Sequence, residues 1–175
     1  MPEWAERWLE AGISEVEAMY AYQDRFVFIS RSEGTNFNAL AQWVEWFSPE
    51  LDFPRLAAAR IEARFLSGVS NPDNVYGAFF EALIRTASDA PWTGAVREDD
   101  FWIRRKFYPA EDDIAGEALP LVEEDWNFLI LVTIDKTLFA SQLAAVFRNV
   151  NPSPRLTREQ NNATNRVKDR FFDGF

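Results

Sequence analysis

Three stretches of the chain place apolar, β-branched and aromatic residues in the patterns that strands favour. Residues 25–30 (RFVFIS) form a short apolar run, which the Glu-Gly pair at 33–34 ends. Residues 101–108 (FWIRRKFY) alternate between two faces, as the side chains of a strand do. Residues 126–134 (WNFLILVTI) are apolar on both faces, which predicts a central strand that is buried on both sides. We expect the last two strands to be antiparallel neighbours.

Helical spacing of apolar residues accounts for most of the remaining chain. The predicted helices share good helix formers and apolar residues at i, i+3 and i+4. They cover residues 2–20, the segment that Asn36 or Thr35 caps, and residues 56–66, 75–88 and 135–147, and Asp135 is the predicted cap of the last helix. Gly12 weakens the first of these, so we expect a shorter helix that ends near Ala11. Pro49 and Pro54 are predicted to break the helical pattern, because each lacks a backbone donor and its ring clashes with the preceding turn.

The order of these elements predicts the α+β class. We expect a small, mainly antiparallel sheet of about three strands, packed against several helices that cover mainly one of its faces. Residues 1–150 are expected to form a single α+β domain, because 175 residues suit one domain better than two. Residues 151–175 are predicted to be a polar C-terminal tail that is partly helical or frayed.

An acidic segment separates the second and third predicted strands. Residues 109–125 carry seven acidic residues and no Lys or Arg. Such charge runs are usually solvated loops. A divalent cation is the alternative interpretation, because hard cations prefer several carboxylate oxygens. The clusters at 111–113 and 123–125 lack the spaced Asp-x-Asp-x-Asp-Gly pattern of a calcium loop, so no metal ligand is assigned.

The composition of the chain mainly excludes certain classes of site and partner. The chain has 16 Phe, 7 Trp and 4 Tyr, which favours either a stable core or an aromatic contact surface. It has no His and no Cys, which excludes Cys/His zinc sites, thiol chemistry, disulfides and His-activated nucleophiles. Its net charge of −10 disfavours nucleic acids and anionic membrane surfaces as partners. No nucleotide-binding loop or serine nucleophile motif is present, so no catalytic residue and no cofactor is assigned.

The second predicted strand carries the candidate contact site. Trp102, Arg104, Lys106 and Tyr108 lie on one face of this strand, and Arg105 adds a third cation on the other face. The functional interpretation is a site for an anion or an acidic partner, in which the two rings offer cation–π contacts. The structural alternative is that these cations pair with the neighbouring acidic loop or extend over a solvated sheet face.

Several segments together resemble a known family. They are an opening Pro-x-Trp at 2–4, RFVFISRSEG at 25–34, AAARIEAR at 57–64, DDFWIRRKFY at 99–108 and FLILVTIDKTLFASQL at 128–143. Over residues 2–149 the chain resembles the small bacterial outer-membrane lipoprotein domain of the twenty-kilodalton gastric-pathogen type, which has relatives in spirochaete envelopes. The resemblance implies a cell-envelope domain without enzymatic activity, which faces the periplasm or the outer surface. Any attachment to a membrane is then through a lipid anchor outside this chain, and no functional residue is transferred.

We therefore expect a non-catalytic cell-envelope domain that acts as a protein-interaction or structural module. Its expected partner is another envelope protein. The alternative is a domain that binds a small apolar molecule or a lipid in an aromatic-lined cavity. A carboxylate-only enzyme is a third hypothesis, which needs two acids with raised pKa in one cleft. The expected location is the periplasm or the outer membrane, and a cytoplasmic location is the alternative.

Overall fold

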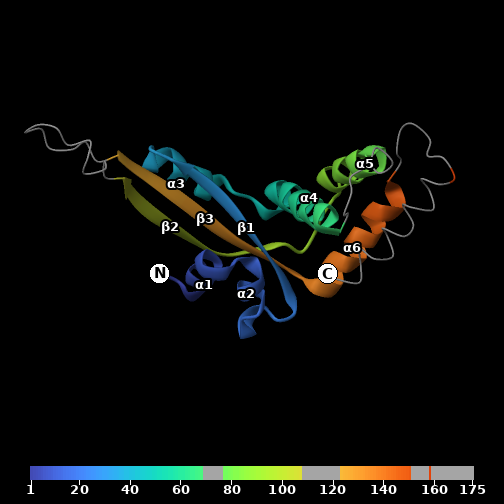
Figure 1. The fold of residues 1–175 in the computed structure, drawn as a ribbon, viewed down its shortest axis with the longest axis horizontal. Coiled ribbons are helices and arrows are strands. Elements are labelled where there is room, and N and C mark those ends of the chain that lie inside the picture. The colour runs from blue at the N-terminus through green and yellow to red at the C-terminus, as the bar shows by residue number, and fades with distance from the viewer. Residues whose placement is uncertain (69–76, 108–122, 151–157, 159–175) are drawn as a thin grey trace, which may run out of the picture.

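The chain folds around one antiparallel sheet that has helices on both of its faces (Figure 1). The structure is a computed structural model, and it describes residues 1–68, 77–107, 123–150 and 158. Its three strands are β1 (Arg25–Gly34), β2 (Val96–Phe107) and β3 (Glu123–Asp135), in the spatial order β1-β3-β2. The predicted α+β class is confirmed, and so are the central position of the third strand and its antiparallel pairing with the second.

All three strands are longer than the sequence patterns indicated. β1 continues past its predicted end, and β2 begins earlier than predicted, at Val96. Residues 123–125 belong to β3, so the prediction that they form part of an acidic loop is wrong. They extend the strand because two of them lie opposite basic residues of β2, where opposite charges stabilise the pairing. The rest of the predicted loop, 109–122, lies outside the described residues, as does the tail at 151–175 apart from Arg158.

Four helices lie on one face of the sheet. They are α3 (Phe37–Trp46), α4 (Pro49–Gly68), α5 (Gly77–Ser88) and α6 (Lys136–Asn149). Figure 1 shows α3 along the strands, whereas α4, α5 and α6 lie together toward one end of the sheet. Their apolar faces meet the strands in the larger of two buried clusters, which includes Phe28, Phe53, Ile130 and Phe139. This cluster holds most of the buried rings of the described chain.

Two short helices cover the other face of the sheet. They are α1 (Glu3–Ala11) and α2 (Ile13–Glu17), and a 3-10 turn, η1 (Tyr20–Tyr22), connects them to β1. Trp4 and Val16 of these helices form the smaller buried cluster with Val27, Leu129 and Leu131 of the sheet. β3 is therefore buried on both sides, which explains why its sequence is apolar on both faces.

The prediction that both prolines break the helical pattern is confirmed at Pro49, where α4 begins after the end of α3 at Trp46, and is wrong at Pro54. Pro49 is the first residue of the helix, and the carbonyl oxygen of Ser48 accepts two backbone hydrogen bonds from the first turn. Proline is tolerated at this position because its missing N–H has no helical partner there. Pro54 lies inside the helix and costs about 3 kcal/mol. Burial of Phe53 and Ile61 on the same helix offsets this cost, since each such side chain contributes about 1.5–3 kcal/mol.

The predicted helix ends are confirmed at three places. Gly12 separates α1 from α2, and its φ of 88° is a conformation that glycine adopts at little cost. The side chain of Asn36 caps α3 by accepting a hydrogen bond from the backbone N–H of Ala39 at 3.1 Å. Asp135 caps α6 in the same way and accepts from Leu138 at 2.8 Å. Each cap satisfies one of the N–H groups that a helix leaves unpaired at its start.

Candidate functional site

Three of the four residues predicted as a contact site are described, and all three lie on the outer strand β2. Trp102 is 46% exposed and packs edge-to-face against Phe37 and Trp126, with ring centroids 5.6 and 5.2 Å away. The ring centroids of Phe37 and Trp126 are 4.8 Å apart, so each of the three rings packs against the other two. Tyr108 lies outside the described residues.

The cations of this predicted site are paired with acids of the neighbouring strand β3. Lys106 and Arg104 approach Glu124 to 3.2 and 3.9 Å. Arg105 donates two hydrogen bonds to Asp125, at 2.9 and 2.8 Å. These hydrogen bonds are the largest cause of the raised pKa of the Arg105 guanidinium. The pairs are those that the structural alternative expects, and contact with a partner through this face stays a prediction.

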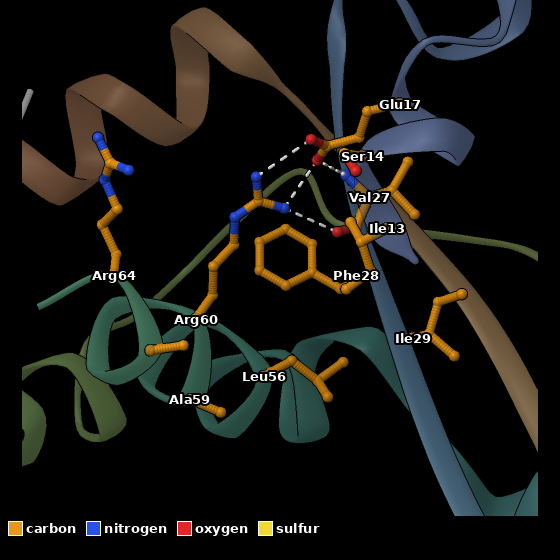
Figure 2. A pocket seen from close by; sticks show the side chains of 11 residues that line it. Ile13, Ser14, Glu17, Val27, Phe28, Ile29, Leu56, Ala59, Arg60 and Arg64 are labelled. Atoms are coloured by element: carbon orange, nitrogen blue, oxygen red, sulfur yellow. Dashed lines mark hydrogen bonds and ion pairs between the residues drawn. The ribbon is translucent and has the colours of Figure 1, made fainter. Parts of the chain in front are cut away.

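A recess lies at the other edge of the sheet, along β1 (Figure 2). We call it the edge groove: α2 forms one wall with Ile13 and Glu17, β1 contributes residues 27–29, and α4 forms the other wall with Leu56, Arg60 and Arg64. Its volume is about 800 Å³. The lining is mainly apolar, and its three charged side chains are those of Glu17, Arg60 and Arg64.

Glu17 and Arg60 meet inside the edge groove and bind both each other and the backbone of Val27. The Nη1 and Nη2 atoms of Arg60 donate to Oε1 and Oε2 of Glu17 at 2.7 and 3.3 Å. The N–H of Val27 donates to Oε1 of Glu17 at 2.8 Å, and Nη1 of Arg60 donates to the carbonyl oxygen of Val27 at 2.8 Å. Figure 2 shows these contacts as dashed lines. The two side chains are only 18% and 23% exposed, so solvent screens their attraction less than that of a surface pair.

The backbone of Val27 belongs to the open edge of the sheet. In an antiparallel pair, backbone groups point alternately toward the neighbouring strand and away from it. The N–H and C=O groups of Val27 point away from β3, and no register shift interrupts β1, so those of Ile29 and Arg31 also point outward. Among the described residues, these later outward groups have no hydrogen-bond partner. The ion pair therefore takes the place of a neighbouring strand at Val27 alone.

Arg60 is held in the edge groove by two aromatic rings. Its guanidinium carbon lies 4.6 Å from the ring centroid of Phe26 and 5.2 Å from that of Phe28. Ala57 and Ala58, which are almost fully buried, allow α4 to approach the sheet closely. Cation–π contacts contribute about 0.5–2 kcal/mol each, depending on how far the cation is removed from water. The guanidinium is thus fixed in position by the fold.

The groups needed for acid–base catalysis are not combined in the edge groove. Glu17 is the one acid in its lining, and both of its oxygens accept hydrogen bonds. A smaller recess of about 310 Å³ gathers four glutamates of α1 and α2 around Arg7, but all four are exposed. Within the described ranges, no group of three acids is placed to hold a metal ion.

Neither Glu17 nor Arg60 was predicted as a site residue from the sequence. The run AAARIEAR at 57–64 predicts a regular helix, and Arg60 is the charged residue next to its small, buried positions. That position is a usable signal, because a cation beside a buried helix face needs a partner. The partner lies 43 positions away in the chain, so no local spacing identifies it.

No protein-family model, curated protein or solved structure matches the chain. The resemblance to small outer-membrane lipoprotein domains therefore stays a prediction from residue patterns. Among the helices that the structure describes, none has the length and apolar character that a membrane span requires.

Proposed function

We propose that the chain is a non-catalytic interaction module that binds an extended segment of another protein along the outer edge of β1. One observation carries this proposal. Side chains bind both outward backbone groups of Val27. The outward backbone groups of Ile29 and Arg31 have no hydrogen-bond partner in the described part of the chain. An extended segment supplies the missing donors and acceptors in the way that a neighbouring strand does.

The walls of the edge groove support this mode of binding. An added strand lies about 4.8 Å from β1, which places it between the layers formed by α2 and α4. Its side chains point alternately to the two walls, where Ile13 and Leu56 are available for apolar contact. Backbone hydrogen bonds then provide affinity, and the walls select side chains that fit.

Protection of the edge is the simpler explanation of the ion pair, because an open edge invites unwanted pairing between chains. Glu17 and Arg60 bind the backbone at Val27 only. The outward groups of Ile29 and Arg31 lie on the same strand, whose pairing is uninterrupted, and they have no such cover among the described residues. Protection therefore accounts for one end of the edge and leaves the rest for a partner.

We further propose that this module works in the bacterial cell envelope, with another envelope protein as its partner. The support is the resemblance of residues 2–149 to small outer-membrane lipoprotein domains. Fractionation of cells that carry the native gene tests this location. We expect the protein in the membrane fraction, from which detergent and not high salt releases it, and recovery in the cytosol would contradict the proposal.

The size of the edge groove favours a second candidate, which is a small apolar molecule or a lipid. Its volume of about 800 Å³ lies within the range of ligand sites, and most of its lining is apolar. The two candidates differ in the groups that they use. A lipid needs the apolar walls, whereas an added strand also needs the outward backbone groups of β1.

A proline substitution on each outer strand separates the two candidates. Arg31→Pro removes one outward N–H of β1 and leaves the ladder with β3 intact, because proline is tolerated on edge strands. Arg104→Pro makes the matched change on β2. The wild-type chain is used to select binders from a library of short random peptides with free C-termini. We expect the selected peptides to bind Arg31→Pro about tenfold more weakly, since one hydrogen bond contributes about 0.5–1.5 kcal/mol.

Arg104→Pro is expected to bind these peptides as the wild-type chain does. Equal binding by all three chains, or a selection that yields no peptide, would count against strand addition. A fluorescent fatty acid serves as the lipid probe. Saturable binding of this probe, equal in Arg31→Pro and in the wild type, would support the lipid candidate instead.

A further inference from the structure

We infer that the bound segment ends inside the edge groove, with its C-terminal carboxylate in the place that Glu17 occupies. This inference rests on the proposed strand addition and names what the groove recognises, which is a free C-terminus that follows apolar residues. Glu17 is then an internal stand-in for the carboxylate of the partner.

The position of Glu17 has the donors of a carboxylate-binding site. Oε1 accepts from the N–H of Val27 at 2.8 Å and from Nη1 of Arg60 at 2.7 Å, and Oε2 accepts from Nη2 of Arg60 at 3.3 Å. An arginine fork combined with a backbone amide binds carboxylates strongly, because the hydrogen bonds are charge-assisted and fix the plane of the anion. The fold thus builds a carboxylate site at the edge of a sheet.

A terminal carboxylate suits this site because it continues the peptide backbone. The N–H of Val27 points outward from β1, toward the line along which the main chain of an added strand runs. A segment antiparallel to β1 pairs first with Arg31 and Ile29 and brings its C-terminus to Val27. Figure 2 shows the carboxylate of Glu17 beside Val27 on the groove side of β1, which is the place that the terminal carboxylate would take.

Only the side chain of Glu17 has to move for this exchange. Val16, its neighbour on α2, is fully buried in the smaller cluster and keeps the helix in place. The Glu17 side chain is 18% exposed and rotates about its own bonds into solvent. Arg60 remains between the rings of Phe26 and Phe28 and is ready for the incoming carboxylate.

The charges of the edge groove favour an anionic occupant. When Glu17 turns outward, Arg60 and Arg64 are the charged side chains left in the lining. They lie one turn apart on α4 and project to the same side of it (Figure 2). The chain as a whole carries a net charge of −10, so a positive groove differs from the average surface and attracts a carboxylate.

Acetate tests the carboxylate site without knowledge of the partner. Glu17→Ala removes the internal carboxylate, and the amide resonance of Val27 is followed by NMR while sodium acetate is added. We expect a saturable shift toward the wild-type resonance in Glu17→Ala and none in the wild type, with sodium chloride at equal ionic strength as the control. The absence of a saturable shift in the folded variant would overturn the inference.

Peptides with free and amidated C-termini test the terminus itself. Each peptide that the wild-type chain selects is made in both forms and titrated into the wild type and into Glu17→Gln, which keeps an acceptor for the Val27 amide. We expect the amide form to bind the wild type about tenfold more weakly, since it loses charge-assisted hydrogen bonds to Arg60. The free acid is expected to bind Glu17→Gln more tightly than the wild type, because the internal competitor is neutral.

Glu124→Gln is the matched control, because it neutralises a carboxylate of the central strand β3, outside the edge groove, and it is expected to bind both forms as the wild type does. Amidated peptides that bind as tightly as free acids would refute the inference and leave strand addition standing. If neither form binds, strand addition fails, and the inference fails with it.

Discussion

The two outer strands of this sheet treat their open edges in different ways. On β2, Lys106 and Arg104 reach back across the sheet to Glu124 of β3. A register shift between Arg97 and Asp99 interrupts the pairing of the same strand. Charged side chains and bulges of this kind hinder the addition of another strand. These features make the outer edge of β2 less suited to the addition of a strand.

β1, by contrast, depends on groups from outside the sheet. It is a regular strand of ten residues, and the outward backbone groups of Val27 are bound by Glu17 of α2 and Arg60 of α4. The Glu17 side chain can rotate away from the backbone amide of Val27 without loss of the ladder between β1 and β3. This difference is the reason for our proposal that another chain binds at β1 and not at β2.

Removal of Arg60 is the change with the largest expected effect. Arg60→Ala leaves the partly buried carboxylate of Glu17 without its cation, so we expect the free energy of unfolding to fall by about 2–3 kcal/mol. Lys106→Ala removes an exposed cation of β2 and is expected to cost less than about 0.5 kcal/mol. Urea unfolding followed by tryptophan fluorescence measures both changes. Equal losses would remove the energetic distinction between the two edges.

Truncation of Trp102 tests whether the aromatic side of β2 is structural. Fully buried tryptophans cost about 3–5 kcal/mol on truncation to alanine, and Trp102 is 46% exposed, so we expect a loss of about 2 kcal/mol. Trp46, which is 77% exposed on α3, is the control and is expected to cost little. Urea unfolding again provides the measurement. A loss for Trp102→Ala as small as that for Trp46→Ala would favour a contact role for the ring.

Hydrogen exchange compares neighbouring amides along β1. The Val27 amide is bound by Glu17, whereas the outward amide of Ile29 has no partner among the described residues, so Val27 is expected to exchange more slowly. In Glu17→Ala, exchange at Val27 is expected to rise about tenfold, which corresponds to a hydrogen bond of about 1.4 kcal/mol. The amide of Phe28, which points toward β3, serves as the control. A rate at Val27 that does not change would mean that Glu17 does not protect this edge.

The smallest effect is expected at alkaline pH, from the titration of the Tyr22 phenol in η1. Burial raises the pKa of the Tyr22 phenol above its usual value of 10.0, and the negative charges of Glu98 and Asp99 raise it further, against an opposing contribution from Arg25. The unfolded chain therefore loses this proton first. The resulting stabilisation is complete below pH 10 and is lost as the pH rises through the folded pKa.

Absorbance of the phenolate at alkaline pH measures this titration. We expect the wild type to show an ionisation step above the usual tyrosine pKa of 10.0, and Tyr22→Phe to abolish that late step. A late step that persists in Tyr22→Phe would assign it to another tyrosine.

Local sequence patterns predicted most of the fold. The run at 126–134 is apolar on both faces, and it forms the strand that is buried on both sides. Asn36 and Asp135 were predicted as caps and accept the expected backbone hydrogen bonds. These predictions succeeded because each depends on residues that are close together in the chain.

The failures depend on contacts between distant segments. Pro54 remains inside α4 because burial of that helix against the sheet outweighs a local cost. Residues 123–125 form a strand because β2 supplies opposite charges beside them. The edge groove needs Glu17 and Arg60 to meet at Val27, and no pattern within a helix or a strand places α2 next to α4.

The central position of β3 also has a consequence for how the chain folds as the ribosome makes it. β1 and β2 never pair with each other, and both pair with the strand at residues 123–135. When β1 emerges from the ribosome, its only partner in the sheet is still to be translated, and β2 must wait for it as well. Nascent chains shorter than this have α1 to α5 without a sheet to cover, so they expose apolar surface on which chaperones act.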